Sequence, residues 1–79
     1  MVFGEFKKRR LFKKAIDCRD QGNYQEALVL LDDVIEMDPY YAKALSLKGS
    51  IFKKFGKYGE SIVCYDKALE LDSTLWEVW

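Results

Sequence analysis

The sequence predicts an all-α protein built from two antiparallel helix-turn-helix hairpins. Residues 22–28 read Gly-Asn-Tyr-Gln-Glu-Ala-Leu and return 34 residues later as Gly-Lys-Tyr-Gly-Glu-Ser-Ile. A fixed period of this length is typical of helical repeat arrays. Around this motif, apolar residues recur at three- and four-residue steps, which places them on one face of a helix. The connections between these amphipathic stretches are short, as expected for neighbouring helices that run in opposite directions.

The composition fits one small globular domain. The chain has 79 residues, of which 49% are hydrophobic and 33% are charged. A core of this size contributes only about 3 to 5 kcal/mol, and open repeat arrays need about three units to be stable alone. We therefore expect two units to be marginally stable. Thirteen basic and thirteen acidic residues cancel, so the net charge favours neither a nucleic-acid partner nor a membrane.

The two cysteines indicate a reducing environment. Cys18 and Cys64 lie inside apolar helical patterns, and the chain has no histidine. This pattern predicts small buried thiols without a disulfide, metal or cofactor, and so a cytoplasmic protein. No uncharged stretch approaches the roughly 20 residues that cross a bilayer. Phe3 and Phe6 precede the basic run at 7–10, which is the reverse of a secretory signal. We therefore expect a soluble protein.

The first hairpin is predicted from residues 5–38. Apolar spacing indicates a helix from Glu5 to Asp20, which the glycine at position 22 ends because glycine readily adopts the left-handed conformation. A second helix is expected from Tyr24 to about Met37, where Asp38-Pro39 stops it. The side chains expected to face inward on the second helix are Ala27, Leu28, Leu31, Val34 and Ile35.

The second hairpin is predicted from residues 40–71. A third helix should begin at Tyr40 or Tyr41 and end at Phe55, and a fourth should run from Tyr58 to Leu71. Glycine inside a helix costs about 0.5 to 1 kcal/mol relative to alanine. Gly49 therefore suggests that another backbone approaches the third helix at this point. The apolar positions of the fourth helix are Ile62, Tyr65, Ala68 and Leu69.

The last residues are rich in large apolar side chains. Leu75, Trp76, Val78 and Trp79 form a group that the chain is expected to bury. Ser73 stands 34 residues after Pro39, so the fourth helix either breaks there or continues into this tail. The sequence leaves both possibilities open.

The repeated positions resemble the tetratricopeptide repeat family, whose 34-residue unit is a hairpin of a helix A and a helix B. In the first copy the matching residues are Leu11, Ala15, Gly22, Tyr24, Ala27 and Pro39. In the second copy they are Leu45, Gly49, Phe52, Gly56, Tyr58, Ser61, Tyr65 and Ala68. The departures from the family pattern are Cys18, Leu31 and Val34 in the first copy, Ser73 in the second, and a lysine in both, Lys14 and Lys48.

The resemblance implies a single domain over residues 1–79, with repeats at about 8–41 and 42–75 and the start of a third at 76–79. It also implies that the hairpins stack as a right-handed α-α superhelix with helices A on the concave side. Family members commonly bind extended or C-terminal peptide segments there. The positions that would face this groove are Arg9, Phe12, Ile16 and Arg19 in the first copy, and Lys43, Ser46, Ser50 and Lys53 in the second.

Charge is sorted by helix. Helices A carry the basic residues Lys7, Lys8, Arg9, Arg10, Lys13, Lys14, Arg19, Lys43, Lys48, Lys53 and Lys54. Helices B carry the acids Glu26, Asp32, Asp33, Glu36, Glu60, Asp66 and Glu70, against one lysine, Lys67. The sequence therefore predicts a protein-binding module whose basic concave face takes an acidic peptide segment. The alternative is that basic helices only pair with acidic neighbours at their edges.

Other functions find less support. A self-assembling scaffold that oligomerises through residues 75–79 and the open repeat ends is the main rival to peptide binding. The basic run at 7–14 would suit RNA, but the acidic helices B oppose that partner. Asp32, Asp33 and Glu36 form a carboxylate cluster whose spacing partly repeats at Asp66 and Glu70, as a solvated outer face would. We therefore predict neither a catalytic nor a metal site.

Overall fold

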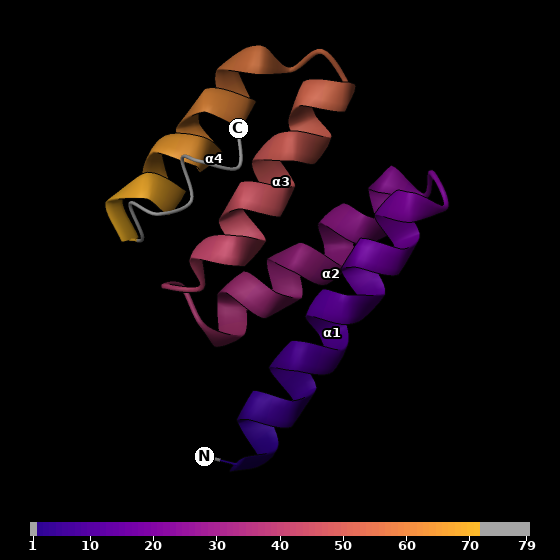
Figure 1. Ribbon diagram of the computed structural model, residues 1–79, viewed down its shortest axis with the longest axis vertical. Helices are drawn as coiled ribbons and strands as arrows, with labels where there is room; N and C mark the ends of the chain where they lie inside the picture. Colours follow the sequence, from indigo (N-terminus) through magenta and orange to yellow (C-terminus); the bar gives the residue numbers. More distant parts are fainter. Residues whose placement is uncertain (1, 72–79) are drawn as a thin grey trace. The chain divides into compact units, whose positions relative to one another are not determined.

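The computed structural model describes residues 2–71 of the chain, with side chains from residue 6 onward. It contains α1 (Val2–Asp20), α2 (Tyr24–Met37), α3 (Ala42–Lys54) and α4 (Tyr58–Leu71). Residues 2–71 form helices and turns without a strand, which confirms the all-α prediction (Figure 1). The predictions for Ser73, Leu75, Trp76, Val78 and Trp79 fall outside the described residues.

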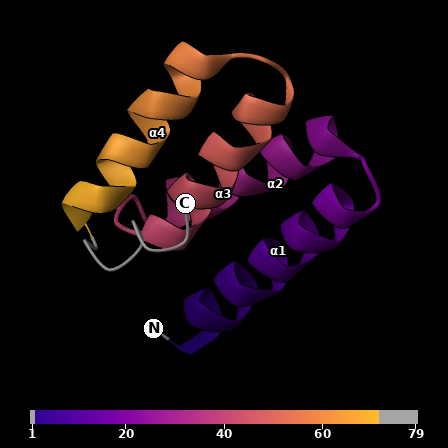
Figure 2. The same cartoon turned by 45° about the horizontal axis from the view of Figure 1, so that its top comes forward.

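The chain divides into two compact units, Met1–Pro39 and Tyr40–Trp79. We call α1 with α2 hairpin 1 and α3 with α4 hairpin 2. In each hairpin the two helices lie side by side and run in opposite directions (Figures 1 and 2). This architecture agrees with the hairpin unit of the predicted fold. The stacking of the hairpins into a superhelix stays a prediction, as does the single domain over residues 1–79.

The same turn closes the first helix of both hairpins. Gly22 and Gly56 have φ angles of 84° and 77°, which L-residues with a side chain rarely adopt. In hairpin 1 the Asn23 N–H donates a hydrogen bond of 2.8 Å to the Cys18 carbonyl, and the equivalent bond in hairpin 2 is 2.9 Å. This six-to-one bond defines a Schellman motif, which satisfies carbonyls at the helix end. The sequence repeat therefore corresponds to a repeated backbone structure.

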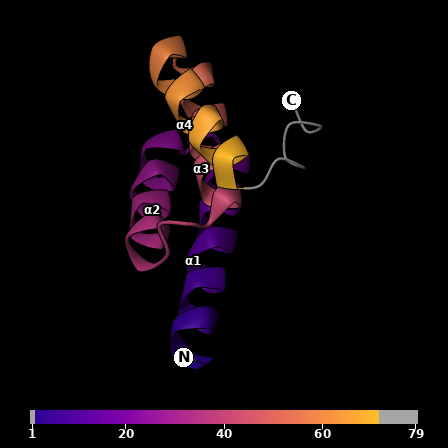
Figure 3. The same ribbon diagram turned by 90° about the vertical axis from the view of Figure 1, so that its left-hand side faces the viewer.

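The helix bounds agree with the prediction for α2 and α4 and differ for the other two. α1 begins at Val2 rather than Glu5, so its first turns extend past the end of α2 (Figure 3). α3 begins at Ala42 because Tyr41 is extended, with φ −80° and ψ 91°, and serves as the N-cap. It ends at Lys54, and Phe55 is the C-cap residue.

Small residues lie at the centre of hairpin 1. Ala15 on α1 and Ala27 on α2 are fully buried, as are Leu31 and Val34. Leu28 and Ile35, which were also predicted to face inward, are half-buried. The predicted inward face of α2 is therefore confirmed at its centre and partly solvent-accessible at its edges.

Hairpin 2 has a close helix contact at Gly49, as predicted. A Cβ atom on Gly49 would lie 3.2 Å from the Ser61 carbonyl oxygen and 3.3 Å from Cβ of Cys64. Ser61 and Ala68 are the buried residues of α4. Because they define its inner side, Ile62 projects outward and is 58% exposed, although its place in the apolar pattern suggested burial. The contact at Gly49 is therefore made by the α4 backbone at Ser61, by Cys64 and by the edge of the Tyr65 ring.

We predict that Gly49→Ala destabilises the protein. The added methyl group would lie 3.2 Å from the Ser61 carbonyl oxygen, and because this neighbour is helix backbone, relieving the contact costs about 1 to 3 kcal/mol. The gain in helix propensity offsets only about 0.5 to 1 kcal/mol of that cost. Urea unfolding followed by circular dichroism measures the difference in free energy of unfolding.

Gly59→Ala is the matched control. Gly59 is also helical, but a Cβ atom there would meet nothing within 4 Å. This variant should be as stable as the wild type or more stable by up to about 1 kcal/mol. If Gly49→Ala raises the free energy of unfolding as Gly59→Ala does, then α4 does not approach Gly49 this closely.

Candidate functional site

The predicted groove positions of α3 lie on one accessible stripe of that helix. α3 buries Ala42, Ala44, Leu45, Leu47, Gly49 and Ile51. Lys43 and Lys53 are exposed, and Ser46 and Ser50 between them are half-buried. Their spacing of three or four residues places all four on the same side of the helix. We call these four residues the α3 stripe.

The α3 stripe has a cation at each end and small hydroxyl side chains between them. Lys43 and Lys53 are ten positions apart, which corresponds to about 15 Å along a helix axis. Serine side chains are short, so they leave room for another chain to lie between the two lysines. Ammonium groups and hydroxyls both donate hydrogen bonds, which suits a ligand that carries carboxylates and backbone carbonyls.

Lys48 and Phe52 lie on a different side of α3. Both are half-buried, and the Lys48 Nζ atom lies 5.8 Å from the centre of the Phe52 ring, one helical turn away. This is the geometry of a weak cation-π interaction. The Lys48 side chain is therefore engaged with its own helix rather than with the α3 stripe.

The predicted positions on α1 also share one side of their helix. Arg9 is exposed, while Phe12, Ile16 and Arg19 are half-buried. The Arg19 guanidinium donates to the Asp20 carboxylate from Nη2 at 2.9 Å and from Nε at 3.1 Å. Arg19 therefore brings a partly neutralised charge to this surface, and Arg9 is its main cation. The two apolar side chains lie between the two arginines.

Lys8 does not belong to the accessible basic surface of α1. Its Nζ atom donates to Oδ2 of Asp38 at 2.9 Å, and the Lys8 side chain is only 13% exposed. The bond joins α1 to the residue that ends α2. It is an instance of the pairing between a basic helix and its acidic neighbour that the sequence left open as an alternative to ligand binding.

Most of the remaining charges of hairpin 1 are sorted by helix, although Asp17 and Asp20 are exposed acids on α1. The exposed basic residues of α1 are Lys7, Arg9, Arg10, Lys13 and Lys14. The exposed acids of α2 are Glu26, Asp32, Asp33 and Glu36. The basic and acidic helices predicted from the sequence are therefore also basic and acidic at their solvent-accessible surfaces.

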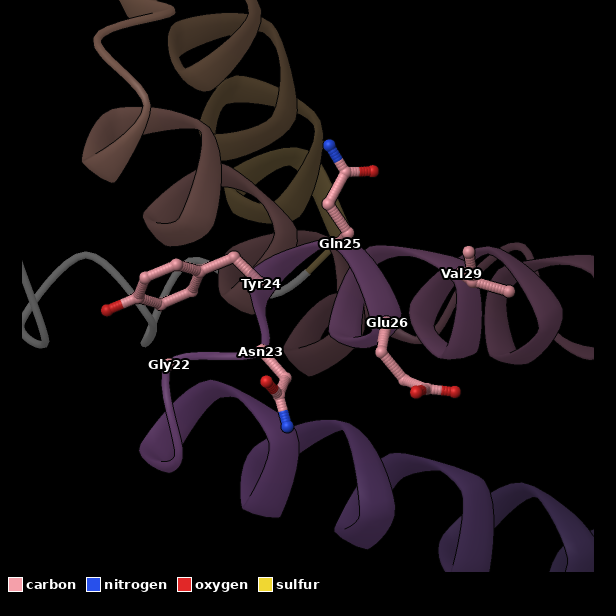
Figure 4. Close-up of a pocket in the computed structure, with 6 residues that line it drawn as sticks. All are labelled: Gly22, Asn23, Tyr24, Gln25, Glu26 and Val29. Atoms are coloured by element: carbon pink, nitrogen blue, oxygen red, sulfur yellow. The ribbon is translucent and has the colours of Figure 1, made fainter.

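Two depressions lie on hairpin 1. One, of about 540 Å³, surrounds the start of α2 and is lined by Gly22, Asn23, Tyr24, Gln25, Glu26 and Val29. Figure 4 shows that the side chains of Tyr24, Gln25 and Glu26 project in different directions. A small-molecule site needs polar groups that converge on the ligand. This depression therefore lacks the arrangement expected of a ligand pocket.

The second depression, of about 480 Å³, is a groove between α1 and α2. Leu11 and Met37 form its apolar part, and Lys7, Asp33 and Glu36 supply its charges. Met37 is 40% exposed. We call these five residues the α1–α2 groove. Apolar spacing identified Leu11 as a core position, but the sequence did not indicate that this groove would remain open.

The described side chains contain no group of three or more cysteines and carboxylates placed to hold a metal ion. Asp32, Asp33 and Glu36 are all exposed on α2. None of the helices described over residues 2–71 has the length and apolarity to cross a bilayer. The predicted self-association residues, Leu75, Trp76, Val78 and Trp79, lie outside this part of the chain.

Comparison with known proteins gives one family and a few relatives. Residues 42–75 match the tetratricopeptide repeat family. The uncharacterized protein MJ0572 of Methanocaldococcus jannaschii is 27% identical over 64 residues, which cover 81% of this chain and 74% of that protein. DnaJ protein P58IPK homologs B and A of Oryza sativa subsp. japonica are 34% and 33% identical over 61 residues. Those alignments cover 77% of this chain and 13% of each rice protein.

We predict that Lys8→Met lowers the free energy of unfolding by about 1 kcal/mol, because it leaves the Asp38 carboxylate without this partner. Lys13→Met is the matched control, since Lys13 is exposed on the same helix and methionine has a similar helix propensity. Thermal unfolding at low and high salt measures both variants. Equal effects of the two substitutions would contradict a structural role for the Lys8–Asp38 pair.

Proposed function

Because residues 42–75 make this chain a member of the tetratricopeptide repeat family, we propose that it binds an extended or C-terminal acidic segment of a partner protein. Members of this family generally act as protein–protein interaction modules, not as enzymes. The proposal is therefore for a non-enzymatic scaffold module that needs no cofactor. A cytoplasmic location is part of it, and cysteines that take part in no disulfide, Cys18 and Cys64, support that location.

The observation that carries the proposal is the α3 stripe. α3 buries six of its thirteen residues, and the four residues at the predicted groove positions remain accessible. Lys43 and Lys53 at its ends attract acidic groups, while Ser46 and Ser50 offer hydrogen bonds to the ligand backbone. Lysine and serine also occur on ordinary solvated helix faces, so the peptide titration below is the test that separates the two interpretations.

The spacing of the two lysines suggests the form of the ligand. About 15 Å along the helix corresponds to four or five residues of an extended chain at about 3.3 Å per residue. We therefore propose a segment with two acidic groups separated by about that number of residues. A C-terminal carboxylate can serve as one of the two groups. On hairpin 1, Phe12 and Ile16 offer contacts to an apolar side chain and Arg9 adds a further cation.

We predict that peptides with two acidic residues four or five positions apart bind more tightly than neutral peptides of the same length. Fluorescence anisotropy of a labelled peptide measures the dissociation constant. Lys43→Glu and Lys53→Glu should each weaken binding by about tenfold, because each replaces an attraction by a repulsion. The loss should shrink as salt rises, since these side chains are exposed.

Lys67→Glu is the control for this titration. Lys67 is exposed on α4, away from the α3 stripe, so the same change in net charge should alter peptide affinity by less than about twofold. Equal and negligible affinity for acidic and neutral peptides would overturn the proposal. Ion pairs between basic helices and their acidic neighbours would then explain the charge pattern.

Self-assembly is the second candidate function. Four large apolar residues, Leu75, Trp76, Val78 and Trp79, follow the described part of the chain. Their apolarity favours burial against a second copy. We predict that deleting residues 76–79 lowers the mass that sedimentation equilibrium measures over a concentration series. An unchanged mass and an unchanged free energy of unfolding would exclude the tail from assembly.

A further inference from the structure

An apolar stripe runs along α4 beside its buried face, and its Tyr65 ring reaches Gly49 of α3. Tyr58, Ile62, Tyr65 and Leu69 follow one another at steps of four, three and four residues, which aligns them along the helix. Tyr58 is 61% exposed and Ile62 is 58% exposed, while Tyr65 and Leu69 are half-buried. We call these four residues the α4 stripe. Its spacing is the one with which a helix packs against another helix.

The α4 stripe has an acidic border. Asp66 and Glu70 are exposed, lie one turn apart, and flank the stripe on the side away from the buried Ser61 and Ala68. A helix that covers the stripe would therefore meet apolar side chains and two carboxylates together. The partner with the matching chemistry has an apolar floor and a basic edge.

The α1–α2 groove has that chemistry. Leu11 and Met37 provide apolar surface, and Lys7 makes the α1 edge of the groove basic. Arg10 and Lys14 continue this basic edge along α1 beyond the groove lining, whereas Asp33 and Glu36 make the opposite edge, on α2, acidic. These three basic residues are exposed and spaced by three and four residues, so they form a row along α1. The row can face Asp66 and Glu70 when Tyr58 and Ile62 lie over Leu11 and Met37.

We propose that two copies of this chain associate head to tail, with the α4 stripe of one copy seated in the α1–α2 groove of the other. This inference rests on the self-assembly function proposed above and adds to it a contact between two surfaces of the described helices, separate from residues 75–79. The contact joins different surfaces of the two copies, so each dimer leaves one of each surface available. The oligomer therefore grows as the protein concentration rises, unless the copies close into a ring.

Ile62→Ser and Val63→Ser form a matched test of the α4 stripe. Both residues are exposed β-branched side chains on α4, Val63 at 67%, but only Ile62 belongs to the stripe. Sedimentation equilibrium of the full chain over a concentration series gives the dissociation constant for association. We expect Ile62→Ser to weaken association by about tenfold or more and Val63→Ser by less than about twofold.

A charge exchange tests the groove. One variant carries Arg10→Glu and Lys14→Glu, and another carries Asp66→Lys and Glu70→Lys. Each alone places like charges at the contact and should lose association. In an equimolar mixture, every contact between the two different variants carries opposite charges, which should restore association. This recovery also shows that both variants are folded. Because salt screens exposed charges, association in the mixture should weaken as the salt concentration rises from about 50 mM to about 500 mM.

Three results would overturn the inference. Association that persists in Ile62→Ser, or that Ile62→Ser and Val63→Ser reduce equally, would place the contact elsewhere, including in residues 75–79. Association that appears only after residues 76–79 are deleted would mean that this segment covers the stripe within one chain. A monomer at every concentration would exclude self-assembly altogether. Peptide binding at the α3 stripe is measured separately and is affected by none of these results.

Discussion

The close approach of α3 and α4 at Gly49 is the constraint on which the rest of hairpin 2 depends. A backbone carbonyl of α4 lies where a side chain on Gly49 would begin. Helices packed at this distance favour small residues at the centre of the contact, and α4 accordingly buries Ser61 and Ala68. The Tyr65 ring also reaches Gly49 at this contact. Hairpin 1 follows the same principle with Ala15 and Ala27.

This constraint explains where the accessible surfaces are found. α3 buries six of its thirteen residues, and its accessible residues include the groove positions together with Lys48, Phe52 and Lys54. α4 buries a small face and therefore leaves Tyr58 and Ile62 outside. One hairpin thus carries a polar surface on its first helix and an apolar surface on its second. Both arise from how tightly two helices pack, and their chemistry suits different partners.

Much of the fold could be predicted because period, glycine turns and apolar spacing are local features. The bounds of α2 and α4 and the contact at Gly49 follow from them. The exposure of Ile62 could not be predicted, because a helix with apolar residues on several sides can be rotated to bury different ones. The same limit applies to Lys7 and Lys8. Adjacent lysines are equivalent in the sequence, and only the packing of α1 shows that Lys8 is the one that reaches Asp38.

The sequence predicted the positions of the candidate site residues, but not which of their charges are already paired. Repeat spacing identified Lys43, Ser46, Ser50 and Lys53, and the structure leaves them accessible on one side of α3. The engagement of Arg19 by the adjacent Asp20 depends on side-chain conformation, which spacing does not encode. The sequence also gave no sign that a groove lined by Leu11 and Met37 would stay open.

The two Schellman turns place a different kind of limit on the sequence. At Gly22 and Gly56 there is open space where a side chain would point, so volume does not require glycine at either turn. The positive φ angles do, because an L-residue is strained in that region and its mirror image is not. The handedness of amino acids thus limits the residue at each turn, whereas their size limits the residue at the helix contact of Gly49.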